Sequence, residues 1–248
     1  MTQPSKELPL PGEVFSLAGC TAFFIPPTTT DAPTSWVWYA PTLANLPGPE
    51  EVWMLERFGA AGLAVAGIDV GESYGSPKGR ALYTALYKEM TQRRGMASRP
   101  CLLARSRGGL MLYNWVVENA EKVGGIAGIY PVCNLRSYPG IERACPAYEM
   151  TAEELVARLS QHNPLDRLAP LAQAGVSIFH IHGDCDEVVP LEDNSGALAQ
   201  RYEKLGGEIT LQVVEGGGHT MWEGWFQCRE LVEFVVGRAG RNGPRTLS

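Results

Sequence analysis

The chain has 248 residues, of which 45% are hydrophobic and 19% are charged, and its formal net charge is −6. This composition is ordinary for a globular protein, and the length predicts one domain that spans residues 1–248. The negative charge, with no cluster of lysines and arginines to offset it, argues against nucleic acid as a partner.

Strand-like and helical segments alternate along the chain. Runs of β-branched and aromatic residues predict strands at 14–17, 21–25, 36–39, 63–68, 101–104, 126–130, 176–182 and 208–214. Apolar residues at helical spacing predict helices at 50–58, 79–92, 110–121, 194–204 and 222–238. The opening pair of strands resembles a hairpin. The pattern therefore indicates an α/β fold: a mostly parallel sheet of about eight strands, with helices on both faces and an antiparallel N-terminal edge.

The connection over residues 134–173 is longer than the others and follows the sixth predicted strand. It contains a helix whose N-cap is Thr151, followed by Ala-Glu-Glu and an apolar repeat. A long connection in a compact domain is usually functional, so we expect a small cap-like insert here. The alternative is a surface decoration. Because the insert is short, it favours an open pocket over a buried tunnel.

The first twelve residues contain no apolar signal segment, and no stretch is apolar and long enough to span a bilayer. We expect no membrane partner, and a cytoplasmic location by default, or secretion if a signal peptide has been removed. The six cysteines include no C-x-x-C pair, and we expect them to be reduced. Cys133 and Cys145 bracket an irregular stretch and form the one pair worth testing for a disulfide.

Ser106 lies where the strand at 101–104 meets a helical pattern. A serine held at a sharp strand-to-helix turn needs small residues two positions before and after it, and these are Ala104 and Gly108. The usual spelling of this turn is G-x-S-x-G, so the chain departs from it by one methyl group. The alternative is a plain helix N-cap with a close packing contact.

Candidate partners for a serine nucleophile come later in the chain. The strand at 176–182 runs into Asp184 and Asp186, and the strand at 208–214 is followed by a glycine loop that ends in His219. The order Ser, Asp, His is that of the α/β-hydrolases, whereas chymotrypsin and subtilisin types use other orders. The residues therefore predict Ser106 as the nucleophile, His219 as its general base, and one of the two aspartates as the group that orients the histidine.

Four pieces of the sequence together resemble α/β-hydrolases of the prolyl-oligopeptidase-like and carbohydrate-esterase types. These pieces are Ser-Arg-Gly-Gly at 106–109, Asn-Pro-Leu-Asp-Arg-Leu-Ala-Pro at 163–170, Gly-Asp-Cys-Asp-Glu-Val-Val-Pro at 183–190 and Gly-Gly-His at 217–219. The resemblance covers nearly the whole chain and implies an α/β-hydrolase fold with its cap after the sixth strand. Similarity to the pattern G-x-x-D-x-x-V-P favours Asp186 as the acid, with Asp184 fixing the loop. We expect no cofactor and no metal ion.

An oxyanion hole needs two backbone donors. We expect the N–H of Arg107 and a second one from the loop after the third strand, where Pro41 has none and Thr42 is the candidate. The order Ser-Arg-x-Gly is also similar to that of glucuronoyl esterases, in which the arginine helps to stabilise the oxyanion. The alternative is that Arg107 is an exposed residue of the first helical turn.

Three further residues are candidates for substrate binding. Glu72 and Tyr74 follow the fourth strand, and Trp222 comes just after His219. A carboxylate and aromatic faces, to which Tyr130 and Tyr138 would add, suit a polar, sugar or aryl substrate. For each of them alone the alternative is packing.

Because esters need less help for their leaving group than amides, we expect hydrolysis of carboxylic esters through an acyl-enzyme. The expected substrate is a small ester with a short acyl group, with acetylated saccharides among the candidates. The alternative is a prolyl-oligopeptidase-like peptidase. A different class is a metal-dependent hydrolase using His180, His182 and Asp184, which spell H-x-H-x-D, although the chain has only four histidines. A non-catalytic binding module is the third alternative.

Overall fold

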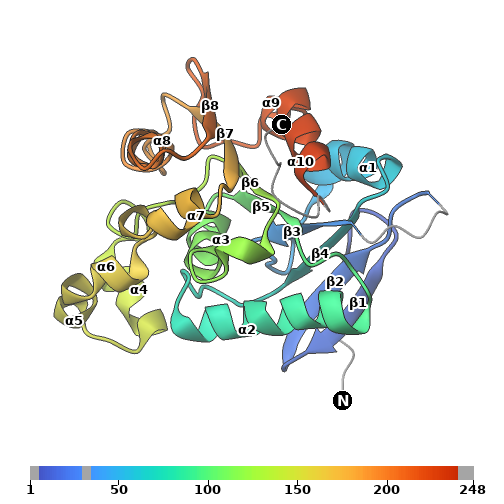
Figure 1. Cartoon of the computed structure of the whole chain (residues 1–248), viewed down its shortest axis with the longest axis horizontal. Helices are drawn as coiled ribbons and strands as arrows, with labels where there is room; N and C mark the ends of the chain where they lie inside the picture. The colour runs from blue at the N-terminus through green and yellow to red at the C-terminus, as the bar shows by residue number, and fades with distance from the viewer. Residues whose placement is uncertain (1–5, 30–34, 240–248) are drawn as a thin grey trace.

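The computed structural model describes residues 6–29 and 35–239 (Figure 1). Its eight strands form one sheet in the order β1-β2-β4-β3-β5-β6-β7-β8. β1 pairs with β2 and β2 with β4 in antiparallel fashion, and the remaining pairs are parallel. The strands are β1 Glu13–Leu17, β2 Cys20–Ile25, β3 Trp36–Ala40, β4 Ala64–Ile68, β5 Cys101–Arg105, β6 Gly125–Ile129, β7 Ser177–Gly183 and β8 Ile209–Val214. The predicted sheet, with its antiparallel N-terminal edge, is confirmed.

Helices cover both faces of the sheet (Figure 1). On one face α1 (Val52–Ala60) and α10 (Arg229–Arg238) pack with one side of the strands. On the other face lie α2 (Pro77–Lys88), α3 (Gly108–Val116) and α8 (Ser195–Lys204). In β3 all five residues are buried, because alternate side chains enter the two apolar layers. Trp38 faces the second layer, where its ring lies 4.6 Å from that of Trp115.

The predicted helix at 222–238 is wrong as one element. The structure divides it into α9 (Glu223–Phe226) and α10, with Cys228 extended between them at φ −68° and ψ 110°. Phe226 before the break and Leu231 after it enter the same apolar layer. The spacing of apolar residues alone therefore does not reveal the break.

The connection between β6 and β7 consists of short helices. These are α4 (Ile141–Ala144), α5 (Ala152–Ala157), α6 (Leu159–His162) and α7 (Ala169–Gln173), with 3-10 turns at Cys145–Tyr148 and Pro164–Asp166. Thr151 caps α5 as predicted: its hydroxyl accepts from the N–H of Glu154, whose carboxylate accepts from the N–H of Thr151. The Tyr148 hydroxyl donates to the carbonyl of Tyr74 at 2.7 Å. This hydrogen bond joins the segment to the loop after β4. The function of the segment as a cap and the extent of the domain stay predictions.

All six cysteines lie within the described residues and are free thiols. Cys133 and Cys145 form no disulfide; their sulfurs contact the carbonyls of Pro131 and Glu142 instead. Over the described ranges, no helix is both long and apolar enough to cross a membrane.

Candidate functional site

Ser106 occupies the turn between β5 and α3 with a left-handed backbone, at φ +48°. This conformation costs about 1–3 kcal/mol in a residue other than glycine. Three hydrogen bonds hold it: the Ser106 N–H donates to Ile129, and the Ser106 carbonyl accepts from the N–H groups of Gly109 and Val132. The surrounding chain thus fixes a strained turn that lifts the hydroxyl from the end of the strand.

The two small residues on either side of Ser106 are small for different structural reasons. A β-carbon on Gly108 would lie 2.1 Å from the carbonyl oxygen of Ala40, so only glycine fits there. Ala104 is fully buried and pairs across the sheet with Ala40 and Gly128. Its methyl group packs within the apolar layer that faces α3. The fold therefore accepts alanine at the first position of the G-x-S-x-G pattern but requires glycine at the last.

Ser106, His219 and Asp186 form one hydrogen-bonded row. The hydroxyl of Ser106 lies 2.9 Å from Nε2 of His219, and Nδ1 of His219 lies 2.7 Å from Oδ2 of Asp186. Asp186 follows β7 and His219 follows β8. Because parallel strands end at the same edge of a sheet, these loops meet beside the turn after β5. An ionised Asp186 can only accept, so Nδ1 of His219 carries the proton and Nε2 is free to accept from the serine.

The environment of Asp186 stabilises its charge. Its Oδ1 accepts from the N–H groups of Val188 and Val189 at 3.0 and 2.8 Å, and its Oδ2 lies 3.4 Å from Nε2 of His182. Burial alone would favour the neutral acid. Hydrogen bonds from His182, His219 and Val189 outweigh this effect and hold the pKa of Asp186 well below its usual value. The carboxylate facing His219 therefore stays ionised.

Asp184, the other aspartate of this turn, has a different contact. Its Oδ1 accepts from the N–H of Gly216 at 2.7 Å. The N–H of Cys185 donates to the carbonyl of Gly217 close by. Asp184 thus ties the turn after β7 to the glycine loop that carries His219.

Two backbone N–H groups near the serine are free to bind a ligand. Neither Arg107 N–H nor Thr42 N–H donates to an acceptor among the described residues. The Thr42 side chain is buried, and its hydroxyl donates to the carbonyl of Tyr39. Lys6 donates to the carbonyls of Leu43 and Leu46 and so holds the loop that follows Thr42. Within residues 6–29 and 35–239, both expected oxyanion donors therefore lack an acceptor, and they lie on segments that other contacts fix.

The expected substrate-binding residues differ in their surroundings. Glu72 forms a short, half-exposed ion pair with the guanidinium of Arg107. Trp222 is 54% exposed and lies edge-on to Trp225, with ring centres 5.4 Å apart. Tyr74, in contrast, is buried in a left-handed conformation among the side chains of the segment between β6 and β7. Glu72 and Trp222 are thus accessible to a ligand, whereas the Tyr74 ring contributes to packing.

Tyr130 lies against His219, and Tyr138 belongs to the segment between β6 and β7. The Tyr130 ring centre is 4.3 Å from that of His219, and its hydroxyl donates to the carbonyl of Thr220 at 3.3 Å. Tyr130 therefore supports the histidine loop. Tyr138 is partly buried against the apolar cluster of its segment.

Sequence reasoning missed a buried ion pair next to the serine. Arg105 pairs with Glu51, whose carboxylate also accepts from the Tyr39 hydroxyl at 2.7 Å. The other guanidinium nitrogen of Arg105 contacts the sulfur of Met221, two residues after His219, at 2.9 Å. The signal that could have found this pair is an arginine at the end of an apolar strand, beside the candidate nucleophile.

The alternative metal site does not assemble. His180 and His182 both direct Nδ1 to the hydroxyl of Ser195, at 2.9 and 2.8 Å, while Asp184 binds the glycine loop. Within residues 6–29 and 35–239, no three His, Cys, Asp or Glu side chains form a group that could hold a metal ion. The two histidines instead belong to a buried hydrogen-bond network.

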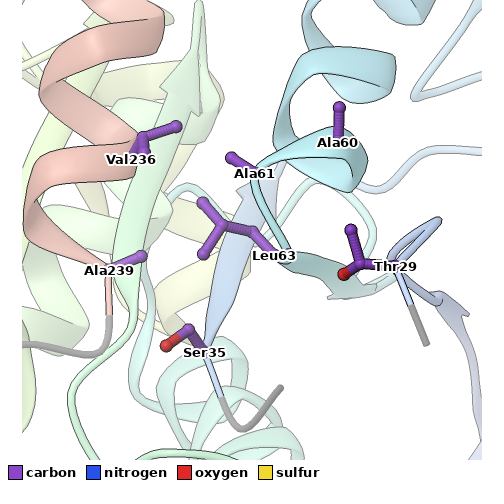
Figure 2. A pocket seen from close by; sticks show the side chains of 8 residues that line it. Thr29, Ser35, Ala60, Ala61, Leu63, Val236 and Ala239 are labelled. Carbon is purple, nitrogen blue, oxygen red and sulfur yellow. The ribbon is translucent and has the colours of Figure 1, made fainter. Parts of the chain in front are cut away.

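A separate pocket lies at the end of the sheet where the parallel strands β3 and β4 begin (Figure 2). It opens where Ser35 precedes β3 and Leu63 precedes β4, opposite to the edge that carries Ser106. Its described walls are mostly small side chains: Thr29, Ser35, Ala60, Ala61, Gly62, Leu63, Val236 and Ala239. These residues offer two hydroxyls but no titratable side chain.

Solved structures with a similar fold are numerous. Dipeptidyl peptidase 4 of Porphyromonas gingivalis matches 92% of this chain at 14% identity with a TM-score of 0.72. MPT51 of Mycobacterium tuberculosis matches 92% at 12% identity with a TM-score of 0.72. The S-formylglutathione hydrolase of Agrobacterium tumefaciens matches 92% at 15% identity with a TM-score of 0.67. No family model and no curated protein matches the sequence.

These likenesses, together with the strand order, define the chain's fold as that of the α/β-hydrolases. The predicted fold class is therefore confirmed. The share of each similar structure that the chain spans differs widely: 35% of the dipeptidyl peptidase, 99% of MPT51 and 93% of the S-formylglutathione hydrolase. The likeness thus extends both to whole proteins and to a part of a larger one.

Proposed function

We propose that this protein is a serine hydrolase that cleaves carboxylic esters through a covalent acyl-enzyme. The observation that carries the proposal is the row of Ser106, His219 and Asp186, with contacts of 2.9 and 2.7 Å. A serine hydroxyl is a weak nucleophile until a base removes its proton, and Nε2 of His219 lies within hydrogen-bond distance of it. The α/β-hydrolase fold supports the same reading.

In the first half of the reaction, Oγ of Ser106 attacks the ester carbonyl carbon while its proton moves to Nε2 of His219. The carbonyl oxygen becomes an oxyanion, to which the N–H groups of Arg107 and Thr42 donate. Collapse of this intermediate breaks the bond to the alcohol oxygen, which takes the proton from His219. Asp186 holds Nδ1–H of His219 and stabilises the imidazolium formed on the way.

In the second half, water replaces the alcohol. His219 removes a proton from water, the hydroxide oxygen attacks the acyl carbon, and a second oxyanion forms in the same place. When it collapses, Oγ of Ser106 leaves and recovers its proton from His219, and the carboxylic acid is released. The reaction needs no cofactor and no metal ion.

The proposed substrates are small esters with short acyl groups, including acetyl groups on saccharides. Trp222, half exposed three residues after His219, offers an aromatic face to a sugar or aryl alcohol. The ion pair of Glu72 with Arg107 adds polar groups beside Ser106. A net charge of −6 weighs against nucleic acid as a partner, and no membrane partner is proposed.

A serine peptidase is the alternative. Dipeptidyl peptidase 4 shares the fold over about a third of its own length, and the same row of side chains could attack an amide. Esters are favoured because an alkoxide leaves more readily than an amide nitrogen, so the site needs less help from a dedicated acid.

Labelling with a fluorophosphonate probe tests the nucleophile. We expect the probe to label the wild-type protein and not to label Ser106→Ala. Circular dichroism should show that both proteins are folded. Aryl esters from acetyl to octanoyl, acetylated sugars and a dipeptide anilide then compare the substrate classes. Folded wild-type protein that is not labelled would contradict the serine hydrolase, and faster turnover of the anilide than of every ester would replace the esterase with the peptidase.

A further inference from the structure

A row of buried polar side chains leads from the interior of the protein to Asp186. Tyr113 on α3, His180 and His182 on β7, and Ser195 on α8 are all 0% exposed. The Tyr113 hydroxyl lies 2.7 Å from Nε2 of His180, and the Ser195 hydroxyl lies 2.9 and 2.8 Å from Nδ1 of His180 and His182. Nε2 of His182 lies 2.8 Å from the Val189 carbonyl and 3.4 Å from Oδ2 of Asp186. We call these four side chains the histidine row.

The partners assign a direction to every hydrogen bond of the histidine row. The Val189 carbonyl can only accept, so Nε2 of His182 carries a proton. If the ring carries this one proton, Nδ1 of His182 accepts the only proton of the Ser195 hydroxyl. That hydroxyl must accept from Nδ1–H of His180, which leaves Nε2 of His180 to accept from Tyr113. Each hydroxyl and ring N–H of the row then has an acceptor, and Nε2–H of His182 is shared between the Val189 carbonyl and Oδ2 of Asp186. The two histidines hold opposite tautomers.

Protonation of His182 would disrupt this order. If His182 were an imidazolium, both of its nitrogens would donate, and the Ser195 proton would have to turn toward His180. Nε2–H of His180 would then donate to Tyr113, whose own proton would have no acceptor in the row. A buried donor without a partner is costly. Burial also lowers the pKa of His180 to about 3, which agrees with a neutral His180.

The histidine row ends on the atoms that fix Asp186. The N–H of Val189 donates to Oδ1 of Asp186, while the carbonyl of Val189 accepts from His182. Oδ2, the other end of the carboxylate, faces both His219 and His182. His182 therefore braces the turn at 186–189 from inside the sheet. In the opposite tautomer, a lone pair of His182 would face two oxygens.

We propose that His182 is a positioning residue for Asp186, and that Ser195, His180 and Tyr113 keep it in the Nε2–H tautomer. This inference rests on the proposed function, because Asp186 matters to catalysis only if His219 acts as a base. Its consequence is that side chains far from the substrate influence the rate through the orientation of one carboxylate.

The tautomers can be measured without any substrate. In protein labelled with ¹⁵N-histidine, which has only four histidines, two-bond ¹H–¹⁵N spectra at neutral pH should show His180 with its proton on Nδ1 and His182 with its proton on Nε2. We expect Ser195→Ala to give a mixture of tautomers for His182. A wild-type His182 that is protonated, or that carries its proton on Nδ1, would overturn the inference.

Kinetics test the effect on the rate. Ser195→Ala should lower kcat for an aryl ester about tenfold, the loss expected for one buried hydrogen bond that matters to the transition state. KM should change little, because no residue of the histidine row is expected to touch the substrate. Tyr113→Phe removes only the far donor and should have a smaller effect in the same direction. It keeps the inference testable if Ser195→Ala does not fold.

Tyr202 provides a matched control. It is as buried as Tyr113, and its hydroxyl donates to the carbonyl of Val176, outside the histidine row. Tyr202→Phe should lower the Tm while leaving kcat and the histidine tautomers unchanged. If Tyr202→Phe lowers kcat as much as Tyr113→Phe does, the row acts through stability alone and the inference fails. If the fluorophosphonate probe does not label the folded wild-type protein, the proposed function is contradicted. If the probe labels the wild-type protein normally but kcat is unchanged in Ser195→Ala, only the inference is contradicted.

Discussion

Arg105, the residue before Ser106, forms an ion pair with Glu51 in the interior of the protein, where the Glu51 side chain is 0% exposed. Glu51 also accepts from Tyr39 and from the N–H of Gly48. Burial opposes the charge of Arg105, but Tyr39 and Glu51 outweigh it and raise the pKa of the guanidinium. The ion pair joins the end of β5 to the start of α1. Through the contact of Arg105 with Met221, it also reaches the loop that carries His219.

Removing one charge of this pair should destabilise the protein strongly. Glu51→Gln keeps the shape and the acceptor for Tyr39 but leaves Arg105 buried without a counter-charge. We expect the free energy of unfolding to fall by about 3–5 kcal/mol, measured by denaturant titration. Glu121→Gln is the control, because the ion pair of Glu121 with Lys122 is exposed and should contribute at most about 1 kcal/mol. Equal losses in the two variants would contradict a structural role for the buried pair.

The two aspartates after β7 should differ in their effect on the rate. Asp186→Asn removes the charge that holds Nδ1–H of His219. We expect kcat for an aryl ester to fall about 10⁴-fold, the loss seen when the acid of a known serine-protease triad is replaced by its amide. Asp184→Asn keeps an oxygen that can accept from Gly216, so its kcat should change less than about tenfold. Steady-state kinetics of both variants, with folding checked by their Tm values, decides between them. A larger loss of kcat in Asp184→Asn than in Asp186→Asn would show that Asp184, and not Asp186, is the carboxylate that matters to the rate.

The row of Ser106, His219 and Asp186 could be predicted because each residue stands just after a strand. Parallel strands bring such positions to one edge of the sheet, so chain order and strand pattern suffice. The register of β5 with β3 and β6 then places the turn at Ser106 between the neighbouring strand ends. The departure at Ala104 from the usual pattern proves compatible with the fold, because the extra methyl group packs in an apolar layer.

Other features depend on contacts between distant parts of the chain. Glu51 meets Arg105 across 54 positions, and Ser195 meets the two histidines of β7 only once α8 packs on the sheet. The burial of Tyr74 likewise requires the segment between β6 and β7, whose Tyr148 binds its carbonyl. Local patterns cannot specify such pairs, because the partner is chosen by the packing of whole elements.

The turn at Ser106 should tolerate change on one side only. Ala104→Gly restores the usual pattern, and we expect unchanged kcat with a loss of about 1 kcal/mol in the free energy of unfolding, since glycine is more flexible in a strand and removes a buried methyl group. Gly108→Ala places a methyl group 2.1 Å from the Ala40 carbonyl and should lower both Tm and labelling by the fluorophosphonate probe. A Gly108→Ala variant with normal labelling would contradict the tight turn.

Arg107 has two candidate roles, one through its backbone N–H and one through its guanidinium, and a substitution can distinguish them. Its guanidinium pairs with Glu72, while its N–H is the expected oxyanion donor. Arg107→Ala keeps the N–H, so we expect kcat to fall by less than about tenfold, against about 10²–10³ for the loss of an oxyanion donor. Glu72→Gln breaks the same ion pair and should have a similarly small effect. A hundredfold loss in Arg107→Ala alone would assign the guanidinium to the oxyanion hole.

Acid should destabilise the protein through His180. An unfolded histidine takes up a proton near pH 6.5, whereas burial lowers the pKa of His180 in the folded protein to about 3. Between these values the unfolded chain binds the extra proton, so the stability that His180 contributes is complete above pH 6.5 and is lost as the pH falls toward 3. The free energy of unfolding should drop by about 1.4 kcal/mol per pH unit for this one proton.

Denaturant titrations between about pH 6 and about pH 5.3 measure this slope while most carboxylates are still ionised. His180→Gln replaces the imidazole with an amide that can still donate and accept. It should reduce the slope of the unfolding free energy against pH by the amount that corresponds to the uptake of about one proton. His162 also has a pKa lowered first by burial, but it is less deeply buried than His180. His162→Gln should therefore flatten the slope less. An unchanged slope in His180→Gln would mean that His180 is protonated in the folded protein, which contradicts the neutral histidine row.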